Sequence, residues 1–113
     1  GKKMQQAFYQ ETAKPFREGT YSITPRIQQN GTEVYWRIRA MSQLEHKEIW
    51  RRSQEQPKRY ETMILAASVC FPDLKQADLQ DHYGAIGAEQ LLEKMLTAGE
   101  FAALREAVED INQ

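Results

Sequence analysis

The sequence predicts a mainly α-helical fold, with four principal helices in a compact bundle and an N-terminal β-hairpin packed against it. From residue 42 to residue 113, apolar residues recur at intervals of three and four, the period of a helix with one buried face. Before that, an Asn-Gly dipeptide precedes a stretch in which apolar and polar residues alternate, as in a half-buried strand. With 113 residues, the chain is expected to form a single domain, residues 1–113.

The β-hairpin is predicted over residues 20–41. Asn30-Gly31 is a strong turn signal, because both residues tolerate the positive φ that a tight hairpin requires. Pro25 restricts the preceding strand to an edge or a bulge. The apolar face of the following strand consists of Val34, Trp36, Ile38 and Ala40. Residues 1–19 are expected either to form a short helix or to stay mobile, as chain ends often do.

The first two helices are predicted from their start and stop signals. Ser42 and Glu45 have the spacing of a capping box, in which each side chain satisfies a free backbone N–H of the helix start. This first helix has a thin apolar stripe, made of Leu44, Ile49 and Trp50. Pro57 suits the first turn of the second helix. That helix is expected to continue through Phe71, until Pro72 stops it.

The stretch DLQDHYGAIGAEQLLEKML, residues 78–96, predicts a corner between helices rather than a ligand site. Gly84 is expected to close a short helix, and Gly87 to be the N-cap of the third principal helix. Tyr83 and Ile86 are expected to pin this corner to the core. The fourth principal helix has an apolar stripe of Phe101, Leu104, Val108 and Ile111.

The sequence contains no convincing catalytic, metal-binding or cofactor-binding pattern, so we expect a protein that is not an enzyme and uses no cofactor. His82 beside Asp81 would suit a general base, but neighbours on a helix point in different directions, and no motif places a nucleophile. Cys70 lies in the apolar stretch ASVCF and is expected to be a buried small hydrophobe. The stretch GAIG lacks the Lys-Ser/Thr of a phosphate loop.

Charge is unevenly distributed along the chain. Residues 37–59 carry seven Lys or Arg against three acids, whereas residues 60–113 carry three against ten. This segregation favours steering of charged partners or association of copies head to tail. A nucleic-acid partner is a weaker hypothesis, because glutamates interleave with the basic residues and the pI is near 6.2.

Neither a membrane span nor a secretion signal is evident in the sequence. No stretch approaches the roughly 20 apolar residues that a transmembrane helix needs. The first ten residues, GKKMQQAFYQ, are basic but lack the apolar region of a signal peptide. We therefore expect a cytoplasmic protein that does not contact membranes.

Two stretches of the sequence, WRIRAMSQLEHKEI and ASVCFPDLKQADLQDHYGAIGAEQLLEKMLTAGEFAALREAVEDIN, resemble the XkdN-like tail assembly chaperones. These proteins come from tailed phages and PBSX-like prophages of Gram-positive bacteria. The family pattern has a strand ending in W-x-I-R, a PDL connector, and a block LQDxYGxxGAExLLxxML. The residues that match it as structural markers include Trp36, Asp81, Tyr83, Gly84, Gly87 and Glu89. The likeness is strongest from residue 71 onward.

The resemblance implies a role in assembly rather than a reaction. Proteins of this family are thought to coat the tape measure protein and to keep that long, helical rod soluble until the tail tube polymerises around it. The implied location is the cytoplasm of the bacterial host cell. The resemblance also implies a longer form made by ribosomal frameshifting, and self-association is a further expectation.

No motif marks the surface that contacts the tape measure protein. A chaperone of this kind needs exposed apolar or amphipathic surface rather than a pocket. The predicted contact residues lie on the hairpin's second face and on the thin first helix, and they are Tyr35, Ile49, Trp50, Arg51 and Arg52. The alternatives are another phage structural or connector protein, or a small adaptor with a nucleic-acid partner.

Overall fold

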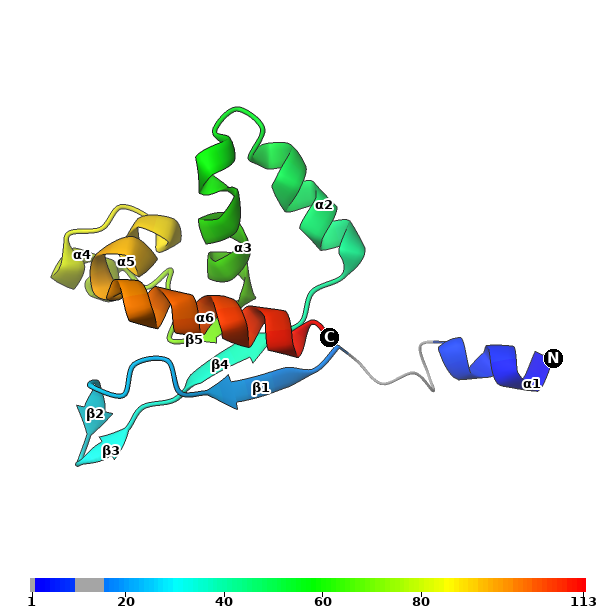
Figure 1. The fold of residues 1–113 in the computed structure, drawn as a ribbon, viewed down its shortest axis with the longest axis horizontal. Coiled ribbons are helices and arrows are strands. Elements are labelled where there is room, and N and C mark those ends of the chain that lie inside the picture. Colours follow the sequence, from blue (N-terminus) through cyan, green and yellow to red (C-terminus); the bar gives the residue numbers. More distant parts are fainter. Residues whose placement is uncertain (1, 10–15) are drawn as a thin grey trace.

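The computed structural model describes residues 2–9 and 16–113 of the chain (Figure 1). The expectation for residues 1–19 therefore falls partly outside the described residues, on residues 1 and 10–15. In chain order, the elements are α1 (Lys2–Gln5), the 3₁₀ turn η1 (Gln6–Phe8), β1 (Glu18–Tyr21), β2 (Gln28–Gln29), β3 (Thr32–Glu33), β4 (Trp36–Arg39), α2 (Gln43–Arg52), the 3₁₀ turn η2 (Pro57–Arg59), α3 (Tyr60–Ser68), β5 (Val69–Phe71), α4 (Ala77–Tyr83), α5 (Ala88–Met95) and α6 (Ala98–Ile111).

The predicted hairpin turn is present, but it forms only the tip of a larger β structure. Asn30 and Gly31 have φ values of 54° and 79°, and they join β2 to β3. Beyond this small two-stranded sheet, β1 pairs antiparallel with β4. Strand β4 also pairs antiparallel with β5, so that the main sheet has the order β1-β4-β5.

The prediction of a mainly α-helical fold with four principal helices is wrong. The fold is mixed α/β: five helices, α2 to α6, follow residue 42, and the strands form two sheets. The second helix was predicted to continue through Phe71. In the structure, α3 ends at Ser68 and Val69 takes an extended conformation. Val69 and Phe71 have β-branched and aromatic side chains, which suit a strand, and β4 provides a partner edge for them. The short helix expected after Asp78 forms as α4.

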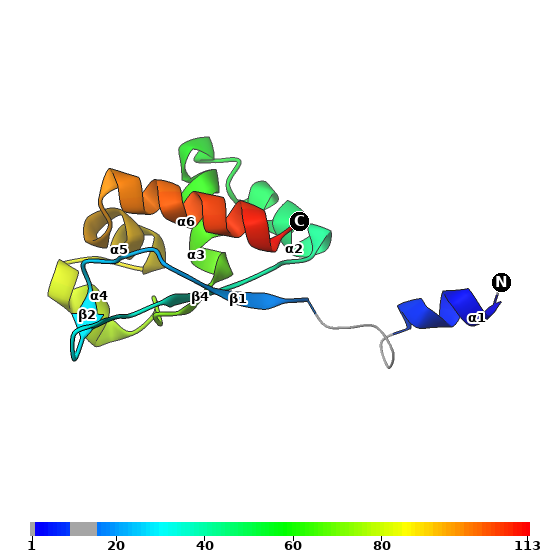
Figure 2. The same ribbon diagram turned by 60° about the horizontal axis from the view of Figure 1, so that its bottom comes forward.

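The core lies between the main sheet and helices α3, α5 and α6. Helix α6 runs across the sheet, and α2, α3, α5 and α6 lie on the same side of it (Figure 2). Trp36 and Ile38 point from β4 into this core, where Leu91, Leu92 and Leu104 are fully buried. Burial of these residues follows the alternation on β4 and the period of three and four on the helices.

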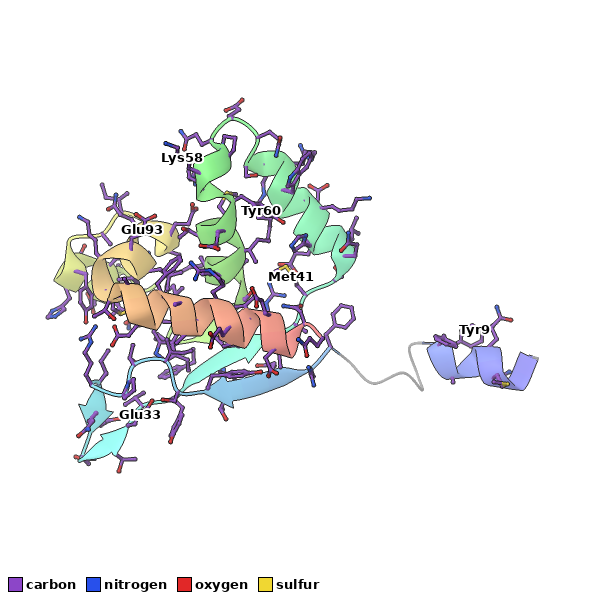
Figure 3. The ribbon with its side chains drawn as sticks, viewed as in Figure 1. Tyr9, Glu33, Met41, Lys58, Tyr60 and Glu93 are labelled. Atoms are coloured by element: carbon purple, nitrogen blue, oxygen red, sulfur yellow. The ribbon has the colours of Figure 1, made fainter. Side chains whose placement is uncertain are left out.

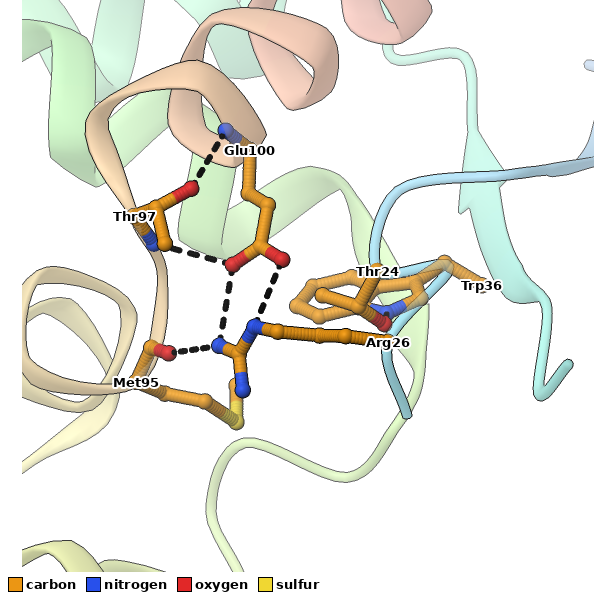
Figure 4. A network of polar contacts seen from close by, with 6 residues as sticks. All are labelled: Thr24, Arg26, Trp36, Met95, Thr97 and Glu100. Carbon is orange, nitrogen blue, oxygen red and sulfur yellow. Dashed lines mark hydrogen bonds and ion pairs between the residues drawn. The ribbon is translucent and has the colours of Figure 1, made fainter. Parts of the chain in front are cut away.

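A polar network ties the loop after β1 to the start of α6 (Figure 4). The Arg26 guanidinium donates two hydrogen bonds to the Glu100 carboxylate, at 2.8 and 2.9 Å, and a third to the Met95 carbonyl at 2.7 Å. Glu100 also forms a capping box with Thr97, whose hydroxyl accepts from the Glu100 N–H at 3.1 Å. The hydrogen bond from Arg26 is the main cause that lowers the pKa of Glu100. The Glu100 carboxylate thus contacts both the N-terminal cap of α6 and the loop that contains Arg26.

The glycine corner of residues 84–87 is largely as predicted. Gly84 is the C-cap of α4 with φ of 65°, and Gly87 is the N-cap of α5 with φ of 88°. Tyr83 is half-buried against the core. The expectation for Ile86 is wrong, because its side chain is 86% exposed. The corner is held instead by polar bonds, such as the one from the Ile86 N–H to the Gln90 side chain at 2.7 Å.

Two other residues of the family pattern lie on the surface near this corner. Glu89, in the first turn of α5, accepts two hydrogen bonds of 2.9 Å from the Arg59 guanidinium. This pair joins α5 to the turn that precedes α3. Asp81 is exposed on α4, and its backbone carbonyl accepts a hydrogen bond from the Gly84 N–H at 3.1 Å.

Candidate protein-interaction surface

Helix α2 stands apart from the main core and packs mainly against α3 (Figure 1). Its start follows the predicted capping box only in part. The Ser42 hydroxyl accepts from the Glu45 N–H at 3.0 Å, as expected. The Glu45 carboxylate, however, binds the Arg39 guanidinium at 3.0 and 2.6 Å. Arg39 is the last residue of β4, so this ion pair fixes the base of α2 to the sheet.

The outer face of α2 carries exposed apolar side chains. Leu44 is 72% exposed and Trp50 is 54% exposed. They contribute to a shallow hollow of about 580 Å³, here named the outer hollow, which is lined by Gln43, Leu44, His46, Lys47, Glu48, Trp50, Arg51 and Tyr60. Exposed Leu and Trp side chains on one protruding helix are typical of a surface that another protein covers.

The predicted contact residues fall in three different places. Trp50, Arg51 and Arg52 are exposed on α2. Ile49 is 1% exposed, because one step along a helix turns the side chain by about 100° and places it toward α3. Tyr35 is exposed between β3 and β4, on the hairpin rather than on α2.

From the sequence, Leu44 was placed in the thin apolar stripe of the first helix, but it was not named among the predicted contact residues. The position of Leu44 relative to the charged residues of the helix was the signal that indicates its exposure. On a helical wheel, Leu44 lies near Lys47, Glu48 and Arg51, which are charged, whereas Ile49 lies well away from them. In the structure, those three charged residues are exposed together with Leu44.

A second cavity lies on the inner side of α2. This groove of about 410 Å³, here named the α2–α6 groove, is lined by Met41, Ser42, Gln43, His46, Tyr60, Glu61, Ile64, Leu65, Arg105, Val108, Glu109 and Asn112. Figure 3 labels Met41 and Tyr60 in this region. The Tyr60 hydroxyl lies 2.9 Å from Nε2 of His46, and both residues also line the outer hollow. The Arg105–Glu61 ion pair at 2.9 Å spans from α6 to α3 at the rim.

Ion pairs neutralise much of the basic stretch at residues 37–59. Four of its seven Lys and Arg residues pair with glutamates, and these are Arg37, Arg39, Arg51 and Arg59. Within the described residues, no ion pair involves the remaining three, Lys47, Arg52 and Lys58. Lys47 and Arg52 both lie on α2, so its surface combines apolar side chains with positive charges that form no ion pair in the described part of the chain.

The residues considered for chemistry lie apart from this surface. His82 is exposed on α4, where its ring meets that of Tyr83 edge to face at 4.9 Å between centroids. Cys70 is half-buried on β5 rather than fully buried. Burial raises the pKa of the Cys70 thiol, and a hydrogen bond to Glu18 raises it further. A raised pKa keeps the sulfur protonated and therefore weakly nucleophilic.

Among the described residues, no group of three or more His, Cys, Asp and Glu side chains has the arrangement of a metal site. No helix in the same part of the chain is both long and apolar enough to cross a membrane. The clearest features of the surface are thus two adjoining hollows around a protruding, amphipathic helix, which is the form of a protein-interaction module.

Comparison with known proteins identifies the family. The model of the phage XkdN-like tail assembly chaperone proteins matches residues 5–113, and the chain belongs to this family. The resemblance inferred from the sequence is therefore confirmed. A crystal structure of the protein YqbN superposes with a TM-score of 0.84 over 94% of this chain and 92% of that one. The two sequences are 18% identical, so this likeness concerns the fold alone. No curated protein gives a significant match.

Proposed function

We propose that this tail assembly chaperone is a non-enzymatic protein that binds the tape measure protein and keeps it soluble until the tail tube assembles. Membership of the family, over residues 5–113, is the observation that carries this proposal. The site of action would be the cytoplasm of the bacterial host. A longer form made by frameshifting would carry the same α2 surface, since α2 lies far from the C-terminal end of the chain.

The outer face of α2 is the surface that we propose for the tape measure contact. A long helical client exposes amphipathic stripes, and an apolar stripe of this kind is bound by apolar side chains on the chaperone. Leu44 and Trp50 are exposed, so a bound client helix would bury their side chains. Tryptophan is among the residue types that contribute most to protein interfaces.

The charges on α2 favour a client with acidic flanks. Lys47 and Arg52 are exposed without ion pairs among the described residues, so acidic side chains beside the client's apolar stripe would be attracted to them. Such charges mainly raise the association rate and select the partner, and they add less to the affinity. The affinity itself is expected to come from Leu44 and Trp50.

Co-expression with the cognate tape measure protein tests this proposal. The wild type should keep the tape measure protein soluble and co-purify with it. The double variant Leu44→Ser/Trp50→Ser should lose this effect, because an interface residue of this kind contributes about 2 kcal/mol or more, which is about 30-fold in affinity. Both side chains are exposed, so the variant is expected to fold, and circular dichroism checks that it does.

Ile86→Ser is the matched control, because Ile86 is also an exposed apolar residue but lies at the glycine corner. This variant should solubilise the tape measure protein as the wild type does. If the double variant matches the wild type, the α2 face is not the contact. If the wild type leaves the tape measure protein insoluble and unbound over its whole length, the chaperone function itself is refuted.

A further inference from the structure

The N-terminal arm, residues 2–9, carries apolar side chains that the rest of the chain does not cover. Met4 is 76% exposed and Phe8 is 84% exposed. They are four residues apart in a helical segment formed by α1 and η1, a spacing that places side chains on one face. Figures 1 and 2 both show the arm clear of the folded body, beyond the N-terminal end of β1.

The root of the arm, by which we mean Arg17 at the start of the folded body, is fixed beside the C-terminal end of α6. The Arg17 guanidinium donates to the carbonyls of Ile111 at 3.0 Å, Asp110 at 2.8 Å and Gln113 at 3.3 Å. Close by, the Met41 N–H donates to the Asn112 side chain at 2.9 Å. Met41 and Asn112 both line the α2–α6 groove. The groove therefore opens at the end of the body from which the arm departs.

We infer that the α2–α6 groove binds the N-terminal arm of a second copy of this chain. The apolar lining of the groove consists of the half-buried Met41 and Ile64 and of Leu65 and Val108, which are largely buried, and it suits Phe8 and Met4. An apolar helical face that lies clear of its own body is stabilised when another molecule covers it. The arm and the groove are thus two unpartnered apolar surfaces of the same chain.

Charge complementarity supports this occupant. By sequence, residues 2–9 carry two lysines and no acid, whereas the lining of the groove includes two glutamates, Glu61 and Glu109, against one arginine, Arg105. Helix α6 forms one wall of the groove. Glu109 lines this wall and, within the described residues, makes no ion pair. A basic arm is therefore attracted to the acidic wall of a neighbouring copy.

The position of the arm favours a neighbouring copy over its own groove. In this conformation the arm lies away from the body, while Arg17 holds its root against α6. In this conformation Met4 and Phe8 are not buried on their own body, so the face that they form is open to another molecule. The inference does not depend on the chaperone proposal, because Leu44 and Trp50 line the outer hollow and not the groove.

Sedimentation velocity of the full chain over a range of concentrations tests the inference. The wild type should associate as concentration rises. Phe8→Glu should weaken this association by about tenfold or more, because it places a charge on the apolar face that becomes buried. Gln5→Glu is the matched control: it adds the same charge to the exposed surface of the same arm but removes no apolar contact, so it should weaken association far less than Phe8→Glu does.

A mixing experiment separates binding in the groove from other modes of association. Met41→Glu alters the groove and keeps the arm intact, so neither this variant nor Phe8→Glu should associate alone. An equimolar mixture should associate, because the intact arm of one variant meets the intact groove of the other. A monomeric wild type, a Phe8→Glu variant that associates like the wild type, or a monomeric mixture of two folded variants would each overturn the inference. Phe8 lies on the exposed arm, so its comparison with Gln5→Glu is decisive even if Met41→Glu fails to fold.

Discussion

At the scale of single residues, the structure shows how a large aromatic side chain is accommodated without an unpaired polar group. Trp36 is 2% exposed, and its indole N–H donates to the Thr24 hydroxyl at 2.9 Å inside the core (Figure 4). Thr24 itself is fully buried. Buried polar groups that lack a partner are costly, so each of the two residues depends on the other.

Trp36→Ala should lower the free energy of unfolding by about 3–5 kcal/mol, because it leaves a large cavity beneath the sheet. Trp36→Phe should cost less, about 1–3 kcal/mol, since most of the ring volume stays and mainly the partner of Thr24 is lost. Urea unfolding followed by circular dichroism measures both values. A loss below about 1 kcal/mol for Trp36→Ala would contradict the burial seen here.

At the scale of elements, the sequence predicts best where a single residue type decides the local conformation. The turn at Asn30-Gly31 and the caps at Gly84 and Gly87 depend on positive φ, and all were expected. Strand β5 was missed because its three residues extend the apolar period of α3, and pairing with β4 is a long-range effect that local periodicity does not contain.

The candidate surface shows the same division between local and tertiary information. The residues predicted as exposed contacts were Tyr35, Ile49, Trp50, Arg51 and Arg52, and of these Ile49 is buried. The sequence did not predict which of Leu44, Ile49 and Trp50 is buried, because this depends on the side of α2 against which α3 packs. The α2–α6 groove is formed by three separate segments, residues 41–46, 60–65 and 105–112, and was not anticipated.

Gly84 and Gly99 provide a matched test of backbone conformation. Gly84→Ala should destabilise the protein by about 1–2 kcal/mol, because an L-residue is strained at the left-handed φ of 65°. Gly99 lies inside α6, has no atom within 4 Å of an added Cβ, and Gly99→Ala should be neutral or stabilise by up to about 1 kcal/mol. Thermal unfolding of the two variants compares them directly, and equal effects would contradict the assigned roles.

At the scale of the whole molecule, the N-terminal third of the chain is tied to the last helix by polar contacts. Arg17 binds the C-terminal end of α6, and the Tyr21 hydroxyl donates to the Asp110 carboxylate at 2.6 Å. This hydrogen bond is the main cause that raises the pKa of Tyr21. Arg26 binds Glu100 at the other end of α6. Helix α6 is thus held at both ends by segments that precede α2.

The Arg26–Glu100 pair predicts a defined dependence of stability on pH. The pKa of Glu100 is lower in the folded protein than its ordinary value of 4.5, so the pair stabilises the fold above that value. This contribution is lost as pH falls through the folded-state pKa. Glu100→Gln keeps a side chain suited to the capping box but removes the charge. It should be less stable than the wild type at pH 7, and the difference should shrink toward pH 3.

Chemical denaturation at a series of pH values measures this difference. Glu93→Gln on α5 removes the same charge from an exposed residue that forms no ion pair within the described part of the chain, and it should show little change. A gap between Glu100→Gln and the wild type that stays constant from pH 7 to pH 3 would show that ionisation of Glu100 does not matter.

The attachment of the arm root also determines how the protein would respond to mechanical load. The arm lies beyond the N-terminal end of β1 and roughly in line with that strand (Figure 1). A pull on the arm would therefore act along β1, and it would load the hydrogen bonds to β4 together in shear instead of opening them one after another. Arg17 adds three bonds to α6 at the same point. In a chain that is joined to others through its arm, tension would therefore reach α6 through Arg17 before β1 could separate from β4.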